Sequence, residues 1–129
     1  MEWRLGRPDE IPEGGRRLFR IGGEVVGVFR VRGRLVAYAN RCPHQGGPVC
    51  QGEVLGRLEE IVDRDRSVVG ERLSAEVLHL VCPWHGWEYE LETGRCWGDP
   101  RFRLRAYPVE EREDGVYVTT GPGSEGDRG

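Results

Sequence analysis

The sequence predicts an all-β protein made of small antiparallel sheets, and its turn residues and strand patterns support this prediction. Of 129 residues, 20 are Gly and 8 are Pro, which fits short strands joined by many turns better than a helical bundle. Several segments rich in Val, Phe and Tyr stop at glycine-containing turn signals, whereas no long segment keeps a helical period. A chain of this length buries enough surface for one core, so we expect a single domain over residues 1–120.

Three strands are expected in the first forty residues. Residues 16–21 end at the turn signal Gly22-Gly23, and residues 24–31 form the next strand. The third strand covers residues 34–40, and the pair Arg32-Gly33 between the second and third strands predicts a hairpin turn.

Further strands are expected in the second half of the chain. Residues 77–81, 87–91 and 116–120 carry strand-forming side chains. Residues 101–106 alternate Arg with Phe102, Leu104 and Ala106, which predicts a half-buried strand. Residues 121–129 contain no apolar side chain, and we expect a disordered tail.

Composition and charge exclude several classes of function. The formal net charge is −3, so nucleic acid is not expected as a partner. No run of about 18 apolar residues is present, so no membrane span is expected. The N-terminal residues lack the apolar core of a signal peptide, which predicts a cytoplasmic protein.

Charge is distributed unevenly along the chain. Residues 1–52 carry nine Arg and five acidic residues, whereas residues 53–78 carry four Arg and seven acidic residues. Residues 79–129 carry six Arg and ten acidic residues. The sequence leaves open whether this reflects an ordinary solvated surface or a polarised docking surface.

The segment 53–76 fits two structures. Apolar residues at 54, 55, 58, 61 and 62 follow a helical spacing, but Gly56 disfavours a helix. A hairpin with Asp63-Arg64-Asp65-Arg66 at its tip fits the same residues, and we expect the hairpin.

Two matched loops carry the chemistry of the sequence. Each follows a predicted strand, begins with Cys-Pro and supplies a histidine, as Cys42-x-His44 in the first loop and Cys82-x-x-His85 in the second. A tetrahedral zinc site, incidental or disulfide-bonded cysteines, and an asymmetric two-iron, two-sulfide cluster all remain open. Mixed Cys/His spacing disfavours zinc, and the absence of a secretory signal disfavours disulfides, so the cluster is favoured.

The two loops resemble the cluster-binding boxes of the Rieske [2Fe–2S] family. The first box is Cys42-Pro43-His44-Gln45-Gly46-Gly47, and the second is Cys82-Pro83-Trp84-His85-Gly86-Trp87. The resemblance covers about residues 3–119 and implies small antiparallel sheets or a barrel, with a cluster-binding subdomain formed by the two loops. It also implies one [2Fe–2S] cluster per chain, with Cys42 and Cys82 on one iron and His44 and His85 on the other.

The resemblance also suggests which residues surround the cluster. High-potential members carry an extra Cys in each box and a Ser two residues after the second His. This chain has Gly47, Trp84 and Trp87 at those positions, which predicts a low potential. Tyr89 is positioned to bond a cysteine sulfur. Gly46, Gly47 and Gly86 could let the backbone approach the sulfides or could be ordinary turn glycines. Trp84 and Trp87 could shield the cluster from water, as could Pro100 from a third loop, although Trp87 could equally be core packing and Pro100 a simple loop proline.

Three ligand-type residues stay outside the resemblance. Cys50 and Cys96 match no ligand position and are expected to be reduced, packed thiols. His79 alternates with Leu78 and Leu80, which predicts a surface or hydrogen-bonded histidine.

The chain departs from the family in the separation of its boxes. Thirty-seven residues separate His44 from Cys82, and residues 55–76 form most of this insertion. The insertion is either a docking element or lid, or a long hairpin that packs its own apolar face.

The expected function is one-electron transfer as a soluble ferredoxin component or as a subunit of an oxygenase or reductase system. Its partners would be a reductase and a terminal oxygenase or large catalytic subunit. A nitrite-reductase-like small subunit is the alternative, with a redox sensor or a zinc module as remoter ones. A complete oxygenase needs a further iron site with two His and a carboxylate, and only His79 remains, so no enzyme activity is expected from the chain alone.

Overall fold

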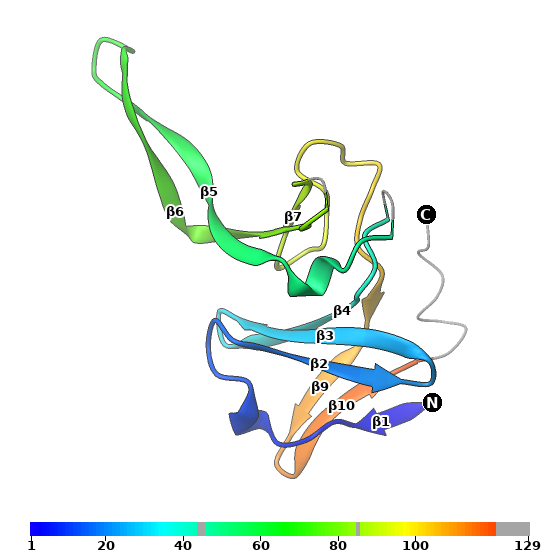
Figure 1. The fold of residues 1–129 in the computed structure, drawn as a ribbon. Coiled ribbons are helices and arrows are strands. Elements are labelled where there is room, and N and C mark those ends of the chain that lie inside the picture. Colours follow the sequence, from blue (N-terminus) through cyan, green and yellow to red (C-terminus); the bar gives the residue numbers. More distant parts are fainter. Residues whose placement is uncertain (44–45, 85, 121–129) are drawn as a thin grey trace.

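The computed structural model describes residues 1–43, 46–84 and 86–120. Three small antiparallel sheets make up the fold, as Figure 1 shows. The all-β prediction is therefore confirmed. Among the described residues, no helix has the length and apolar character needed to cross a membrane. The predicted tail at 121–129 lies outside the described residues.

The central sheet has the strand order β2-β3-β4-β8. Strands β2 (Arg16–Ile21) and β3 (Glu24–Val31) have the predicted bounds, and β4 (Arg34–Ala39) ends one residue earlier than predicted. Strand β8 (Ala106–Tyr107) pairs with β4 at the other edge.

The second sheet joins the two ends of the described chain. Its strand order is β1-β10-β9, so β10 (Gly115–Thr119) lies between β1 (Glu2–Arg4) and β9 (Val109–Arg112). A short 3-10 helix, η1 (Pro8–Glu10), follows β1.

The third sheet contains the ambiguous segment, which forms the expected hairpin. Strands β5 (Glu53–Val62) and β6 (Val68–Val81) pair antiparallel, and β7 (Glu88–Glu90) extends the sheet on the β6 side. The hairpin turn lies at Asp63–Ser67, as its two backbone hydrogen bonds show. In Figure 1 the far half of the hairpin projects away from the body of the protein.

Strand β3 separates two hydrophobic cores. Val26 and Val28 are buried in one core, which includes residues of β4 and β10. Phe29 and Val31 are buried in the other core, which also holds residues of β6 and β7. Successive side chains of a strand point to opposite faces, so one strand serves both cores.

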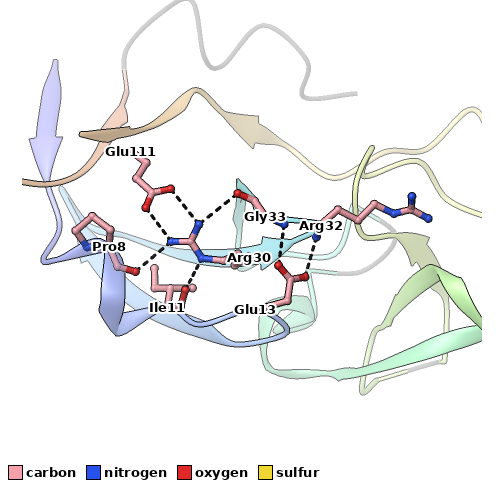
Figure 2. A network of polar contacts seen from close by, with 7 residues as sticks. All are labelled: Pro8, Ile11, Glu13, Arg30, Arg32, Gly33 and Glu111. Atoms are coloured by element: carbon pink, nitrogen blue, oxygen red, sulfur yellow. Dashed lines mark hydrogen bonds and ion pairs between the residues drawn. The ribbon is translucent and has the colours of Figure 1, made fainter. Parts of the chain in front are cut away.

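A network around Arg30 connects three parts of the chain (Figure 2). The guanidinium donates to the backbone carbonyls of Pro8 (3.1 Å) and Ile11 (2.6 Å), and it forms an ion pair with Glu111 (3.0 Å). The Arg30 guanidinium lowers the pKa of the Glu111 carboxyl. Arg30 thus holds η1 and β9 against the end of β3.

The predicted turn at Arg32-Gly33 is confirmed and is capped by a carboxylate. Both residues have positive φ, 53° for Arg32 and 74° for Gly33, as a tight hairpin turn requires. Glu13 accepts hydrogen bonds from both backbone N–H groups, at 2.8 and 2.7 Å (Figure 2).

The predicted strand over 101–106 is wrong in most of its length. Arg103 forms only an isolated bridge with Arg95. Ala106, on the predicted buried face, is exposed, and the next residue, Tyr107, is buried instead. The N–H of Leu104 donates to the Gly94 carbonyl, so this segment bonds to a turn rather than to a continuous strand. The predicted strand 87–91 is shortened to β7.

Cys50 packs against the middle of β3. It lies in a short 3-10 helix, η2 (Val49–Gln51), and is fully buried. Its thiol donates to the carbonyls of Tyr38 (3.4 Å) and Ala39 (3.6 Å). A Cβ on Gly27 would lie 2.6 Å from both Cβ and Sγ of Cys50, so only glycine fits there.

Replacing Gly27 with Ala should therefore destabilise the fold by about 1–3 kcal/mol through overpacking. The measurement is the urea concentration at half-unfolding. Gly98→Ala is the matched control, since no heavy atom lies within 4 Å of the added methyl group, and it should change stability by no more than about 0.5 kcal/mol. Equal midpoints for the two variants would contradict the packing argument.

Cys50 should resist alkylation as long as the chain is folded. Burial raises the pKa of its thiol to about 12, so the thiolate fraction at pH 8 is about one in ten thousand. Iodoacetamide at pH 8, followed by peptide mass spectrometry, should leave Cys50 unmodified in the native protein and modify it in urea. Rapid labelling of native Cys50 would contradict this account.

Candidate metal centre

The two predicted cysteine ligands that begin the loops are both buried. Cys42 follows β4 and Cys82 immediately follows β6, with exposed fractions of 3% and 2%. Both belong to the core that contains Phe29 and Val31. Neither forms a disulfide.

The two loops have the same backbone hydrogen-bond pattern. In each, the cysteine N–H donates to the carbonyl five residues later, and the N–H four residues later donates back to the cysteine carbonyl. The distances are 2.7 Å (Cys42 to Gly47), 2.7 Å (Gly46 to Cys42), 2.8 Å (Cys82 to Trp87) and 3.0 Å (Gly86 to Cys82). The structure therefore repeats one turn on two strands.

Gly46 and Gly86 occupy equivalent positions in these turns. Their φ angles are +79° and +71°, a region that glycine adopts without steric cost. A Cβ at either position would meet no heavy atom within 4 Å. Their requirement for glycine therefore comes from the turn.

Gly47 is required for a different reason, because it brings the two loops together. A Cβ on Gly47 would lie 2.9 Å from the Trp84 ring and 3.1 Å from the Sγ of Cys82. The backbone of the first loop thus packs directly on the second loop beside its cysteine sulfur. No sequence signal distinguished this close approach from an ordinary turn glycine.

The base of the first loop is fixed by polar contacts. The side chain of Asn40 accepts a hydrogen bond from the Cys50 N–H at 2.8 Å and donates to Gln51 at 3.1 Å. Arg16, on β2, donates to the carbonyls of Cys50 (2.8 Å) and Gly52 (2.5 Å). The loop is therefore closed between residues 40 and 50 and bound to the central sheet.

Tyr89 contacts the first cysteine from β7. Its hydroxyl lies 3.0 Å from the Sγ of Cys42, and its side chain is fully buried. Burial, followed by the hydrogen bond with Cys42, raises the pKa of the Tyr89 phenol above its ordinary value. The phenol therefore keeps its proton and can donate a hydrogen bond to a thiolate sulfur.

His79 differs from the predicted surface position. The side chain has no solvent exposure, and its Nδ1 lies 2.7 Å from a Glu88 carboxylate oxygen. Its Nε2 has no hydrogen-bond partner in the described part of the chain. The centre of the His79 ring lies 5.3 Å from the centre of the Trp97 ring. Strand β7 and the loop after it therefore cover a side chain that the strand alternation had predicted to face solvent. The prediction that His79 lies on the surface is therefore wrong, whereas the alternative prediction of a hydrogen-bonded histidine is confirmed for Nδ1.

The other predicted residues are two tryptophans of the second loop, a proline and the two cysteines outside the ligand positions. Trp84 is 56% exposed, whereas Trp87 is half-buried with its ring edge-on to Phe102 at 5.4 Å. Pro100 is exposed in the loop after Trp97. Cys96 is buried with a free thiol, as expected, and Cys50 is too.

His44, Gln45 and His85 lie outside the described residues. Within the described ranges, no group of three or more His, Cys, Asp or Glu side chains could hold a metal ion. The described residues nevertheless fit the cysteine side of a two-iron cluster. They supply two buried thiols on loops in contact, and a buried phenol reaches one of the sulfurs.

The chain matches the Rieske [2Fe-2S] domain family over residues 2–108. It is 30% identical over 105 residues to nitrite reductase [NAD(P)H] of Emericella nidulans, covering 78% of this chain and 8% of that protein. It is 24% identical to the ferredoxin component of the alkene monooxygenase system of Xanthobacter autotrophicus, covering 88% of this chain and 77% of that protein.

Solved structures share the fold. The ferredoxin of carbazole 1,9a-dioxygenase from Nocardioides aromaticivorans matches with a TM-score of 0.64 at 19% identity, covering 93% of this chain and 98% of that one. A putative NADH-dependent nitrite reductase small subunit from Mycobacterium tuberculosis matches with a TM-score of 0.64 at 21% identity, covering 94% and 96%.

The chain spans between 8% and 25% of the length of the first three curated relatives, which are a reductase and two monooxygenase proteins. The family match, by contrast, covers most of the chain and both cysteine loops. The chain belongs to the Rieske [2Fe–2S] family, and this family implies a [2Fe–2S] cluster as its cofactor.

Proposed function

We propose that the protein transfers single electrons through a [2Fe–2S] cluster held by Cys42, His44, Cys82 and His85. The observation that carries the proposal is the repeated turn, which buries Cys42 and Cys82 on two loops joined at Gly47. Cys42 and Cys82 would bind one iron, and His44 and His85 would bind the other. When bound, the cluster supplies one-electron redox chemistry.

The chain's own residues set the environment of the sulfurs. Tyr89 donates a hydrogen bond to Cys42, which favours the more negative, reduced state. Burial of both cysteines excludes water from that side. Trp87 stands where a serine hydroxyl would add a further hydrogen bond, so this environment stabilises the reduced state less than that of the high-potential proteins.

The proposed partners are a reductase that donates the electron and a terminal oxygenase or large catalytic subunit that accepts it. Support comes from relatives in two systems, a ferredoxin component of an alkene monooxygenase and a ferredoxin solved in complex with the oxygenase of carbazole 1,9a-dioxygenase. A mononuclear iron site needs two histidines and a carboxylate, whereas the sequence has one histidine, His79, besides the proposed cluster ligands.

The small subunit of a nitrite-reductase-like complex is the second candidate. It is favoured by the match to nitrite reductase of Emericella nidulans and by two solved small subunits with TM-scores of 0.64 and 0.62. Purification from the native source distinguishes the two. A carrier should purify as a single chain, whereas a subunit should co-purify with a large catalytic chain.

The cluster and its ligands are tested together by electron paramagnetic resonance. The dithionite-reduced protein should give a Rieske-type spectrum, and chemical analysis should find two iron atoms and two sulfides per chain. Cys42→Ser and Cys82→Ser should lose that signal. Cys50→Ser and Cys96→Ser, which alter buried cysteines outside the loops, should keep it. Bound zinc without an iron signal would overturn the proposal.

The reduction potential tests the role of Tyr89. We expect a wild-type midpoint below that of the standard hydrogen electrode near pH 7. Tyr89→Phe should lower it by about 40 mV, because one hydrogen bond worth about 1 kcal/mol in the reduced state is lost. Protein-film voltammetry measures both. An unchanged midpoint in Tyr89→Phe would show that the bond does not discriminate between redox states.

A further inference from the structure

The far half of the β5–β6 hairpin, residues 58–73, is an arm without a partner. In Figure 1 it extends beyond the rest of the protein, with no other strand beside it. No hydrogen bond or ion pair joins it to described residues outside the hairpin. An isolated two-stranded hairpin is at best marginally stable in water, so such an arm gains from being covered.

The arm exposes apolar side chains along its length. Their exposed fractions are 59% for Leu58, 37% for Ile61, 55% for Val62, 55% for Val68, 61% for Val69 and 58% for Leu73. These are six of the eleven exposed large hydrophobic residues in the described part of the chain. Such concentration on one element is typical of an interaction surface. The arm therefore leaves much of its apolar side-chain surface open to solvent.

One face of the arm combines apolar and acidic pairs. Directly opposite residues of an antiparallel pair share a face, and alternate pairs fall on the same face. The pairs Leu58–Leu73 and Glu60–Glu71 therefore line one side, which we name the acidic face; the register shifts after Ile61, so this alternation ends there.

The acidic face carries an unsatisfied charge pair. Glu60 and Glu71 stand opposite each other, and two like charges in this position repel. Neither has an ion partner among the described residues, and both are exposed. On the other face the pair Glu59–Arg72 forms a salt bridge at 3.5 Å. A cation from outside the arm, placed between these carboxylates and next to the pair Leu58–Leu73, would relieve this repulsion.

The chain itself presents a matching surface on β2. Leu18, 36% exposed, and Arg20, also exposed, lie two residues apart on one face of this edge strand. Arg20 has no ion partner in the described ranges. Leu58 and Glu60 have the same two-residue separation, about 6.6 Å along a strand. We name Leu18 and Arg20 the acceptor patch.

We propose that the acidic face of the arm binds the acceptor patch of a second copy of this chain. Leu18 packs against Leu58 and Leu73, and the Arg20 guanidinium lies between Glu60 and Glu71. Contact of two acidic faces is excluded, since it would add further carboxylates to the same site. Every copy carries both surfaces, so two copies can exchange arms around a twofold axis.

Sedimentation equilibrium of the full, cluster-loaded chain from micromolar to millimolar concentration tests this proposal. We expect the weight-average mass to rise above that of one chain, and the rise to weaken as salt screens the charges. Arg20→Glu should increase the dissociation constant at least about tenfold, as should Glu60→Arg/Glu71→Arg. The triple variant Arg20→Glu/Glu60→Arg/Glu71→Arg should regain association, because the signs are exchanged.

Arg34→Glu is the matched control, because Arg34 is also exposed and has no ion partner among the described residues. It should associate like the wild type. The visible spectrum of the cluster checks that each variant is folded. A single-chain mass at every concentration overturns the proposal, and so does equal weakening by Arg20→Glu and Arg34→Glu. A monomer that instead binds a different protein through the arm also overturns it.

Discussion

The contact at Gly47 is the constraint on which the site depends. The two loops come from different strands, and they can share one cofactor only if their cysteines come close. The absence of a side chain at Gly47 lets the first loop rest on Trp84 and on the sulfur of Cys82. Asn40 and Arg16 then fix the base of that loop to the central sheet. Strand β3 supports the arrangement, because one of its faces belongs to the core that encloses both cysteines.

Local signals predicted the strands that are stabilised by adjacent neighbours. Strands β2 and β3 have the predicted bounds because their pairing partner is the next segment in the chain and the turns are marked by glycine. The segment 101–106 has an equally regular alternation, yet its backbone hydrogen bonds go mainly to Gly94, Cys96 and Asp99 in the irregular segment before it, and otherwise to Ala39. Alternation cannot reveal a partner of that kind, and the predicted strand fails there.

In the candidate site, too, local motifs could be predicted from the sequence, whereas contacts between separate segments could not. The paired Cys-Pro motifs were visible in the sequence because each one is local, and the structure places both cysteines in the same core. The burial of His79 was not visible, because strand periodicity tells which face a side chain occupies but not what covers that face. Here Glu88 and Trp97, both later in the chain, enclose the imidazole. The difference between Gly46 and Gly47 likewise needs the position of the opposite loop.

The length of β6 has a mechanical consequence. It runs as one 14-residue strand from Val68, at the far end of the arm, to Val81, and Cys82 is the next residue. Arg57, near the base of the arm, also stacks on Trp97, whose other neighbour is the His79 ring. The pairing with β5 changes register between Leu78 and Leu73, so β6 has an irregularity at the base of the arm. A displacement of the arm can therefore be taken up at this irregularity before it reaches the loop that begins at Cys82.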